Sequence, residues 1–351
     1  MNIFLSDDLM QESSLLKAYK GSRPAITPIW FMRQAGRYLP EYRAIRQRYS
    51  MLEAIQTPEL ASEITLQPIR RFRFDAAIIF ADILTPLIQM GIDLSFDDGK
   101  GPIIHNLIDS PERIDALRVP EAGENCRYTL EAISATVAGL KGAPLIGFAG
   151  APFTLSSYLF GSQGDLAANK LKKFFFGDPK SWERLQTKLA LMVGNYLADQ
   201  AASGAAALQL FDSWIGALSE EQFSEYVEPY LKIILKTVRE RFPAVPLVYF
   251  STCSSQLLKK VAELGFDALS VDWRENIGVV SERLGSNLPL QGNLDPALLF
   301  ASPDRLRAAV SEIMVSAKVC KAHVFNLGHG ILPQTPIENV ELVVELVRSW
   351  R

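Results

Sequence analysis

Residues of types that bind anions stand close together near the N-terminus. Arg33 and Arg37 lie four residues apart with Gly36 between them. Paired guanidinium groups suit bidentate binding of carboxylates or phosphates, so the pair is a candidate anion site. The same side chains would also suit ion pairs with neighbouring acids such as Glu41, because surface arginine pairs are common. The spacing alone leaves both interpretations open.

Asp82 closes the apolar run AAIIFAD. A carboxylate in apolar surroundings is costly unless it is paired or hydrogen-bonded. Such an Asp can simply cap the helix that follows the run, which is a structural role. Its place at the end of a predicted strand favours a functional role instead.

His329 lies in the segment NLGHG, between Gly328 and Gly330. Flanking glycines allow the backbone to approach a ligand closely, and a glycine loop after the last strand is a phosphate site in many barrels. A turn histidine exposed to water is the alternative. Tyr158 and Ser213 are ambiguous in isolation, since they also fit an ordinary helix residue and an ordinary turn hydroxyl.

Metal and nucleotide motifs are missing from the sequence. Cys320 and His323 are three residues apart, but a catalytic zinc site needs three protein ligands and no matching cluster accompanies them. There is no Walker motif and no dinucleotide fingerprint. We therefore expect no cofactor and no metal, and chemistry carried by arginine, carboxylate, tyrosine, hydroxyl and histidine.

Eight short apolar runs have the length of strands. They lack clean polar alternation, as is typical of parallel strands covered on both faces. The runs are residues 27–32, 74–82, 144–151, 206–213, 246–253, 268–273, 289–294 and 323–328. Nearly every run ends on a polar residue or a glycine, which is the arrangement that an active site at strand ends requires.

Helical patterns separate these runs. The segment 219–242 opens with the capping-box residues Ser219 and Gln222 and has helical apolar spacing, and Pro229 is expected to interrupt it. In the last predicted helix, Thr335 is expected to be the cap and Pro336 the first helical residue. The long connection 83–143 predicts a hairpin turning near Asp98 and Gly99, followed by a helix over 127–140.

Eight strand–helix units predict a single (β/α)₈ TIM barrel, formed by residues 1–351 as one domain. Its active site is expected at the C-terminal ends of the strands. A bilobal doubly wound α/β protein is the less favoured alternative.

Composition excludes several classes of function. The chain has 351 residues, with 36 Lys and Arg, 39 Asp and Glu and a net charge of −3, and it has no long basic run. Nucleic acid is therefore not expected as a partner. Three scattered cysteines and an N-terminus unlike a secretory signal indicate a reducing compartment, the cytoplasm. The uncharged segment 142–164 is long enough to span a bilayer, but its prolines and glycines predict a strand, a turn and a helix start.

Five sequence blocks resemble the uroporphyrinogen decarboxylase family. WFMRQAGRYLPEYR (30–43) resembles its N-terminal signature and GFAGAPFTLSSYL (147–159) its second signature. Further blocks are QLFDSWIG (209–216), QGNLDP (291–296) and FNLGHGILPQTP (325–336). The similarity runs from about Leu15 to the C-terminus, with no departure at a position that carries function in the family.

The resemblance implies an enzyme that decarboxylates the four acetate side chains of uroporphyrinogen III, giving coproporphyrinogen III in haem and related tetrapyrrole synthesis. It implies a homodimer of single-domain barrels without cofactor or metal. Asp82 would accept hydrogen bonds from the four pyrrole N–H groups. Asp82, Arg37 and Tyr158 are the catalytic residues carried over, and the group that supplies the ring proton stays open.

The remaining site residues carried over from the family are those that would bind the substrate. Arg33 and Arg37 would hold its carboxylates, and other residues would complete the contacts around the macrocycle. The full substrate-binding set is Arg33, Gln34, Ala35, Gly36, Arg37, Asp82, Tyr158, Ser213 and His329.

Two other functions stay open as alternatives. One is a corrinoid-linked methyltransferase of the same superfamily, which would need zinc held by His and Cys. The other is a non-catalytic tetrapyrrole-binding protein, which would bind without turnover.

Overall fold

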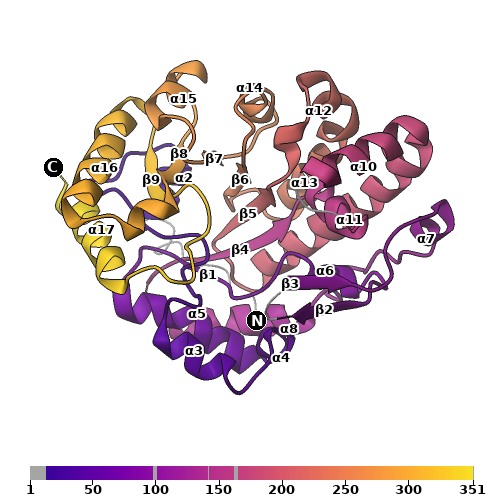
Figure 1. The fold of residues 1–351 in the computed structure, drawn as a ribbon, viewed down its shortest axis with the longest axis horizontal. Coiled ribbons are helices and arrows are strands. Elements are labelled where there is room, and N and C mark those ends of the chain that lie inside the picture. The colour runs from indigo at the N-terminus through magenta and orange to yellow at the C-terminus, as the bar shows by residue number, and fades with distance from the viewer. Residues whose placement is uncertain (1–12, 98–100, 141, 162–164, 351) are drawn as a thin grey trace.

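Seven parallel strands form one curled sheet in the computed structural model, which describes residues 13–97, 101–140, 142–161 and 165–350 (Figure 1). Neighbours in the sheet follow chain order, β1-β4-β5-β6-β7-β8-β9, without the reversal of a doubly wound sheet. The strands are β1 (Ala77–Ile78), β4 (Leu145–Gly150), β5 (Ala207–Asp212), β6 (Leu247–Ser251), β7 (Ala268–Ser270), β8 (Leu290–Leu294) and β9 (His323–Leu327).

The first of the eight predicted strands, residues 27–32, is not a regular strand. It forms one isolated parallel bridge, between Ile29 and Phe325. Its backbone nevertheless reaches both ends of the sheet, because Phe325 N–H donates to Pro28 at 2.8 Å and Asp75 N–H donates to Ile29 at 2.9 Å. We call this stretch the Ile29 segment.

Side-chain oxygens explain why the Ile29 segment has no ladder. They accept from N–H groups that a strand would offer to a neighbouring strand. The backbone N–H of Ile29 donates to Asp75 Oδ2 at 2.9 Å. In the same way, Phe31 N–H donates to Gln34 Oε1 at 3.1 Å and Met32 N–H to Asn326 Oδ1 at 3.0 Å. The prediction of eight strands is therefore confirmed for seven runs and wrong for the first.

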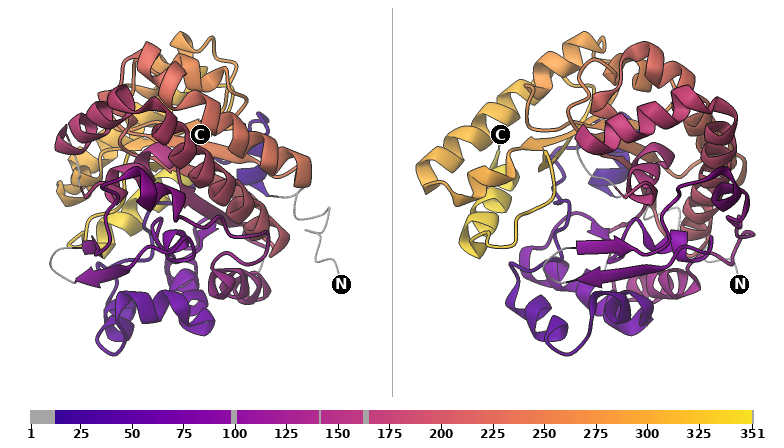
Figure 2. Two further views of the ribbon diagram at one scale, coloured as in Figure 1. Left: turned by 90° about the vertical axis from the view of Figure 1, so that its right-hand side faces the viewer. Right: turned by 45° about the vertical axis from the view of Figure 1, so that its right-hand side comes forward.

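Helices lie outside the curl of the sheet, as the turned views show (Figure 2). The longest, α11, packs against α13 and against β4. The α-helices are α2 (Ser14–Tyr19), α3 (Pro40–Arg46), α4 (Met51–Gln56), α5 (Pro58–Phe72), α6 (Thr85–Ile88), α7 (Pro111–Asp115), α8 (Arg127–Gly139), α9 (Pro152–Leu159), α10 (Asp165–Gly177), α11 (Pro179–Ala202), α12 (Glu220–Tyr226), α13 (Glu228–Arg241), α14 (Leu258–Ala262), α15 (Ile277–Arg283), α16 (Pro303–Ser316) and α17 (Ile337–Ser349), and the 3₁₀ turns are η1 (Ile215–Ala217), η2 (Pro296–Phe300) and η3 (Ala317–Val319).

The predicted hairpin is confirmed as two antiparallel strands, β2 (Leu94–Asp97) and β3 (Gly101–Ile104). It is separate from the main sheet, and β2 contacts α4 and α6. The predicted turn residues Asp98 and Gly99 lie outside the described residues. Helix α8 (Arg127–Gly139) follows the hairpin, as expected for residues 127–140.

The capping box of Ser219 and Gln222 is confirmed at the start of α12. Pro229 separates α12 from α13, as predicted, because its ring fits only the first turn of a new helix. The start of the last helix is predicted wrongly by one residue. Pro336, not Thr335, precedes α17, and the buried Thr335 hydroxyl has no partner among the described residues.

The uncharged segment 142–164 contains β4 and α9, as its prolines and glycines predict. Among the described helices, none combines the length and the apolar character needed to cross a bilayer.

A buried polar network crosses the inside of the sheet. The Gln291 side chain on β8 accepts from Tyr19 Oη at 2.5 Å and from Trp30 Nε1 at 2.9 Å. Its amide nitrogen donates to Gln209 Oε1 at 3.1 Å and to Ser270 Oγ at 2.9 Å. These partners come from α2, the Ile29 segment, β5 and β7. The network therefore fixes the positions of α2 and the Ile29 segment relative to the strands of the sheet.

Candidate active site

The loop that carries Arg33 and Arg37 follows the Ile29 segment. Arg33 has a left-handed backbone, with φ of 61°. The side chain of the buried Gln34 fixes the loop. Its Nε2 donates to the Ala76 carbonyl beside β1 at 3.0 Å, and its Oε1 accepts from Phe31 N–H. The Gln34 side chain is therefore committed to holding the loop, whereas both arginines are exposed.

Backbone donors accompany the two arginines. The N–H groups of Ala35, Gly36 and Arg37 have no hydrogen-bond partner among the described residues. Gln34 N–H, by contrast, donates to Phe31 at 3.0 Å. The loop thus offers three free N–H groups beside two guanidinium groups, and all of these bind carboxylate oxygens well.

Glu41 does not pair with either arginine of the loop. It accepts two hydrogen bonds from Arg71, at 2.8 and 3.0 Å. Within the described parts of the chain, Arg33 and Arg37 have no carboxylate partner. Ion pairing of these arginines with Glu41, which the sequence left open, is therefore wrong.

Asp82 lies in the segment after β1, and its two carboxylate oxygens differ. Oδ1 accepts from Leu84 N–H at 2.8 Å within the turn before α6. Asp82 is not the helix cap that the sequence allowed, because Leu84 is the N-cap of α6 and no side chain caps that helix. Oδ2 has no partner among the described residues. Burial raises the pKa of the Asp82 carboxyl, while the Leu84 N–H and the charge of Arg33 oppose the increase. One oxygen is thus free to accept from a ligand.

Tyr158 and His329 stand with Asp82 and Arg33 in one electrostatic group. Burial, and then the Asp82 charge, raise the pKa of Tyr158, and Arg33 opposes them. Burial, with Arg33 and Arg274 nearby, lowers the pKa of His329 to about 4. The structure therefore brings together four predicted site residues from four separate segments.

The glycines beside His329 make room for other parts of the chain. A Cβ on Gly330 would come within 2.5 Å of Arg33 Cδ, and one on Gly328 within 2.3 Å of Trp273 N. The close approach expected at these glycines is thus one of protein to protein. Gly330 allows the Arg33 side chain to lie against the His329 loop.

Ser213 follows β5, and its carbonyl accepts from Thr252 Oγ1 at 2.7 Å. The next residue, Trp214, brings its indole N–H near the Tyr158 hydroxyl without reaching hydrogen-bond geometry. No described interaction links Ser213 or Arg37 directly to the group of four residues.

A row of aromatic side chains was not singled out from the sequence. Phe148 on β4 meets Phe211 on β5 edge to face, with centroids 5.6 Å apart, and Phe211 meets Phe250 on β6 in the same way at 5.6 Å. Phe250 is 6.2 Å from the His329 ring. The signal was the period of two along β5, which places Gln209, Phe211 and Ser213 on one face. The pairing across strands that joins the row is not visible in a single run.

The segment after β7 also contributes charge that the sequence did not single out. Asp272 is nearly buried and accepts from Arg274 Nη1 at 3.1 Å. The Arg274 guanidinium lies 3.9 Å from the centroid of the Trp273 ring. Asp272 and Trp273 end the predicted strand 268–273, whereas Arg274 lies beyond it and belongs to none of the five sequence blocks.

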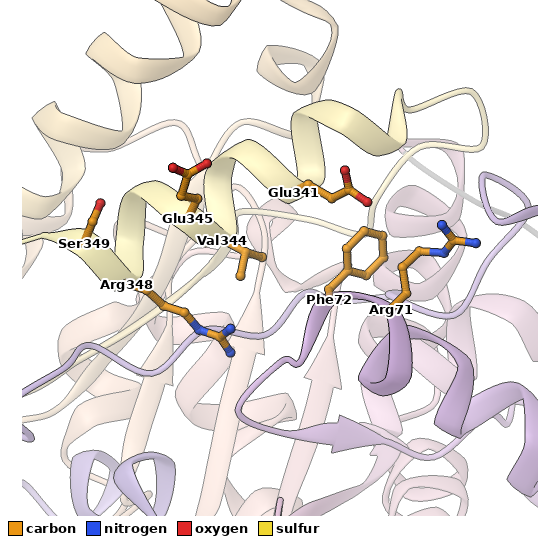
Figure 3. A pocket seen from close by; sticks show the side chains of 7 residues that line it. All are labelled: Arg71, Phe72, Glu341, Val344, Glu345, Arg348 and Ser349. Atoms are coloured by element: carbon orange, nitrogen blue, oxygen red, sulfur yellow. The ribbon is translucent and has the colours of Figure 1, made fainter.

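A separate cavity of about 530 Å³ lies between α5 and α17 (Figure 3). It contains none of the predicted site residues. Its arginines already have partners, since Arg71 binds Glu41 and Arg348 lies 3.8 Å from Asp75. The residues around it are Arg71, Phe72, Glu341, Val344, Glu345, Arg348 and Ser349.

The sequence pair Cys320 and His323 does not mark a metal site. The buried His323 ring bonds the Gly292 carbonyl at 2.8 Å, and burial lowers its pKa to about 4. In the part of the chain that the structure describes, no three His, Cys, Asp or Glu side chains gather in a group that could hold a metal ion.

The fold is that of a TIM-barrel-like α/β protein, with a curled parallel sheet and the exposed arginines Arg33 and Arg37 near the carboxyl ends of its strands. A family model described as uroporphyrinogen decarboxylase (URO-D) matches residues 10–350, and the chain belongs to this family. It is 46% identical to a uroporphyrinogen decarboxylase of Chloroflexus aurantiacus over 326 residues, 92% of each chain. It is 42% identical to that of a Roseiflexus species, covering 97% of this chain and 99% of the relative.

Solved structures share the fold at low identity. A methyltransferase from Methanosarcina mazei superposes with a TM-score of 0.78 at 21% identity, covering 95% of this chain and 96% of the other. A B12-independent methionine synthase from a Shewanella species gives 0.57 at 10% identity, with 83% and 85% covered. These likenesses concern the fold alone.

Proposed function

We propose that the protein is a carboxy-lyase that converts the four acetate side chains of uroporphyrinogen III to methyl groups, giving coproporphyrinogen III and CO₂ in haem and porphyrin synthesis. The observation that carries the proposal is the meeting of Arg33, Asp82, Tyr158 and His329 at the carboxyl-end face. The family membership and the names of its relatives support the substrate and the reaction.

Substrate binding is assigned to the loop of Arg33 and Arg37. The substrate carries eight carboxylates, whereas the chain has a net charge of −3, so local cations must receive it. The free N–H groups of Ala35, Gly36 and Arg37 add uncharged donors. Gln34 acts through its fixed position in the loop, and Ser213 and the aromatic row complete the contacts with the macrocycle.

Asp82 is assigned to the pyrrole nitrogens. Its Oδ2 atom has no partner among the described residues, so it is available to accept hydrogen bonds from the pyrrole N–H groups, with the remaining capacity of Oδ1 beside it. In this role Asp82 is ionised. A buried carboxylate close to the rings then stabilises the positive charge that develops on them during reaction.

The chemistry needs no electron sink other than the substrate. Protonation of a pyrrole ring carbon creates a cation next to the acetate methylene group. The bond between the methylene carbon and the carboxylate then breaks, its electron pair neutralises the ring, and CO₂ leaves. Addition of a proton to the methylene carbon and loss of the ring proton give a methyl group and restore the pyrrole. Each cycle consumes one proton and releases one CO₂.

Tyr158 and His329 take part as neutral groups. The raised pKa of Tyr158 keeps its hydroxyl protonated, and the pKa of about 4 keeps His329 uncharged near neutral pH. Both therefore orient the substrate by hydrogen bonding. Arg37 is assigned to catalysis through the position that it gives to the acid arms of the substrate, because a guanidinium is too weak an acid to supply the ring proton.

We further propose that the Ile29 segment closes the sheet into an eight-membered barrel, with residues 1–351 as one cytoplasmic domain. Its hydrogen bonds to Phe325 and Asp75 support closure, and the free cysteines Cys126, Cys253 and Cys320 fit a reducing compartment.

The family resemblance suggests a homodimer. Light scattering should then give twice the chain mass of 39.0 kDa, and a single chain mass at working concentration would overturn it.

The direct test is turnover by purified protein in the presence of a chelator. Freshly reduced uroporphyrinogen III is supplied anaerobically in the dark, and the products are oxidised and separated by carboxyl number. Products with seven, six, five and four carboxyl groups support the decarboxylase. Binding without products would indicate a carrier, and tightly held stoichiometric zinc would favour a methyltransferase.

A further inference from the structure

Arg274 stands at the carboxyl-end face but belongs to none of the sequence blocks that identify the family. It follows β7, and 45% of its side chain is exposed, against 9% of that of Asp272. The face of the Trp273 ring supports its guanidinium at 3.9 Å. A cation stacked in this way keeps its edge free for hydrogen bonds in the plane of the guanidinium.

Asp272 occupies only part of the Arg274 guanidinium. The carboxylate also accepts from the backbone N–H groups of Cys253 at 2.6 Å and Arg274 at 2.8 Å. The side chains themselves share one bond, from Nη1 at 3.1 Å, rather than a bidentate pair. A guanidinium has five N–H donors, and the other four have no partner among the described residues.

The segment of Arg274 packs directly on the His329 loop. Trp273 meets the His329 ring edge to face, with centroids 6.1 Å apart, and Gly328 has no side chain where Trp273 N approaches. Arg33 and Arg274 both oppose protonation of His329, so both cations lie near it. The site therefore has a third guanidinium with unpartnered N–H donors among the described residues, beyond the loop of Arg33 and Arg37.

We infer that Arg274 binds a peripheral carboxylate of the tetrapyrrole, one of the propionates that all four decarboxylations leave in place. The inference rests on the proposed function. Asp82 is assigned to the pyrrole nitrogens at the centre of the macrocycle, and Arg33 is the cation whose charge acts on the pKa of Asp82. Arg274 is not among the charges that act on Asp82. Its half-exposed side chain suits the longer propionate arm at the rim of the macrocycle.

A propionate contact and a purely structural ion pair predict different kinetics. A propionate is present in the substrate and in every intermediate, so its contact is equally strong before and during each reaction step. Removing it raises KM and leaves kcat unchanged. An exposed ion pair that only holds a loop contributes little, and its removal leaves both constants unchanged.

The test compares Arg274→Gln with Arg283→Gln. Arg283 is a matched control, because its side chain is 40% exposed and pairs with Glu275 through two hydrogen bonds. We expect Arg274→Gln to raise KM for uroporphyrinogen III about tenfold, the effect of one charge-assisted bond, with kcat and the order of intermediates unchanged. Arg274→Lys should recover part of the loss, and Arg283→Gln should behave as the natural protein.

An unchanged KM, or a lower kcat with unchanged KM, would overturn the assignment. Accumulation of one particular intermediate would also overturn it, since that pattern marks an acetate contact. Binding of uroporphyrin III, the oxidised eight-carboxylate analogue, is followed by fluorescence in parallel and should weaken by the same factor. If the natural protein binds this analogue but releases no CO₂, the proposed function fails while Arg274 is still tested by binding. Thermal unfolding confirms that each variant is folded.

Discussion

Arg33 shows how the site is constrained at the scale of single residues. A non-glycine residue in the left-handed region, here with φ of 61°, costs of the order of 1 kcal/mol and persists only where its surroundings hold it. Gln34 supplies that hold through the Ala76 carbonyl. The strained backbone directs the Arg33 side chain across Gly330 toward His329.

The two oxygens of Asp82 allow a selective variant. In Asp82→Asn the side-chain oxygen can still accept from Leu84 N–H, so the turn is kept, while the negative charge facing the rings is lost. We expect turnover to fall by about 10² to 10³, the size of a lost electrostatic contact in a transition state, with melting temperature unchanged. The measurement is the initial rate of CO₂ release.

Asp178→Asn is a suitable control for this variant, because Asp178 accepts from Ser181 N–H at 3.0 Å as a helix cap. It should keep full turnover. Near-normal turnover by well-folded Asp82→Asn would remove Asp82 from the mechanism.

Among the elements, the strands could be predicted from the sequence better than the segment that completes the sheet. Buried parallel strands are continuous apolar runs, and seven of them were found in this way. Residues 27–32 have the same pattern, but oxygens of Gln34, Asp75 and Asn326 take their N–H groups. Two of these partners are far away in the sequence, so no local pattern could reveal the exchange.

Packing between the His329 loop and the Arg33 loop predicts the effect of Gly330→Ala. The new Cβ would lie 2.5 Å from Arg33 Cδ, in the middle of the side chain, so Arg33 must move. We expect KM for uroporphyrinogen III to rise severalfold, with a smaller effect on the unfolding free energy than on binding.

Gly177→Ala serves as the control, because no atom lies within 4 Å of a Cβ at that position. Equal kinetics for the two variants would show that the position of Arg33 is not set by this contact.

His323 links β9 to the stability of the sheet in acid. Burial lowers its pKa to about 4 in the folded protein, against 6.5 when unfolded. Between these pH values the unfolded chain binds one more proton at this residue than the folded chain does. The contribution of His323 to the unfolding free energy is therefore fully present above about pH 6.5 and decreases as the pH falls toward 4. The loss from this residue between pH 7 and pH 5 is on the order of 2 kcal/mol.

Urea unfolding at both pH values measures this dependence. His323→Gln keeps a donor for the Gly292 carbonyl but has no proton to gain, so its stability should change less between pH 7 and pH 5. An identical change in both proteins would assign the acid sensitivity to other groups.

At the scale of the whole molecule, five sequence blocks indicate a candidate site, but not every residue of this candidate site lies in them. Arg33, Asp82, Tyr158 and His329 were found because each stands after a strand or within a family block. The contacts that join Phe148, Phe211 and Phe250 cross three strands, and Arg274 lies outside the five blocks. The fold also occurs in a methyltransferase at 21% identity, so function follows from these side chains and not from the architecture.

The central claim is that the substrate ring alone accepts the electrons and that protons from water complete each methyl group. Turnover of uroporphyrinogen III in D₂O, with a chelator present, tests it directly by mass spectrometry of the oxidised product. We predict four molecules of CO₂ for each substrate and one deuterium in each of the four new methyl groups. Product without deuterium in these methyl groups, or folded protein that leaves the substrate unchanged, would contradict the account.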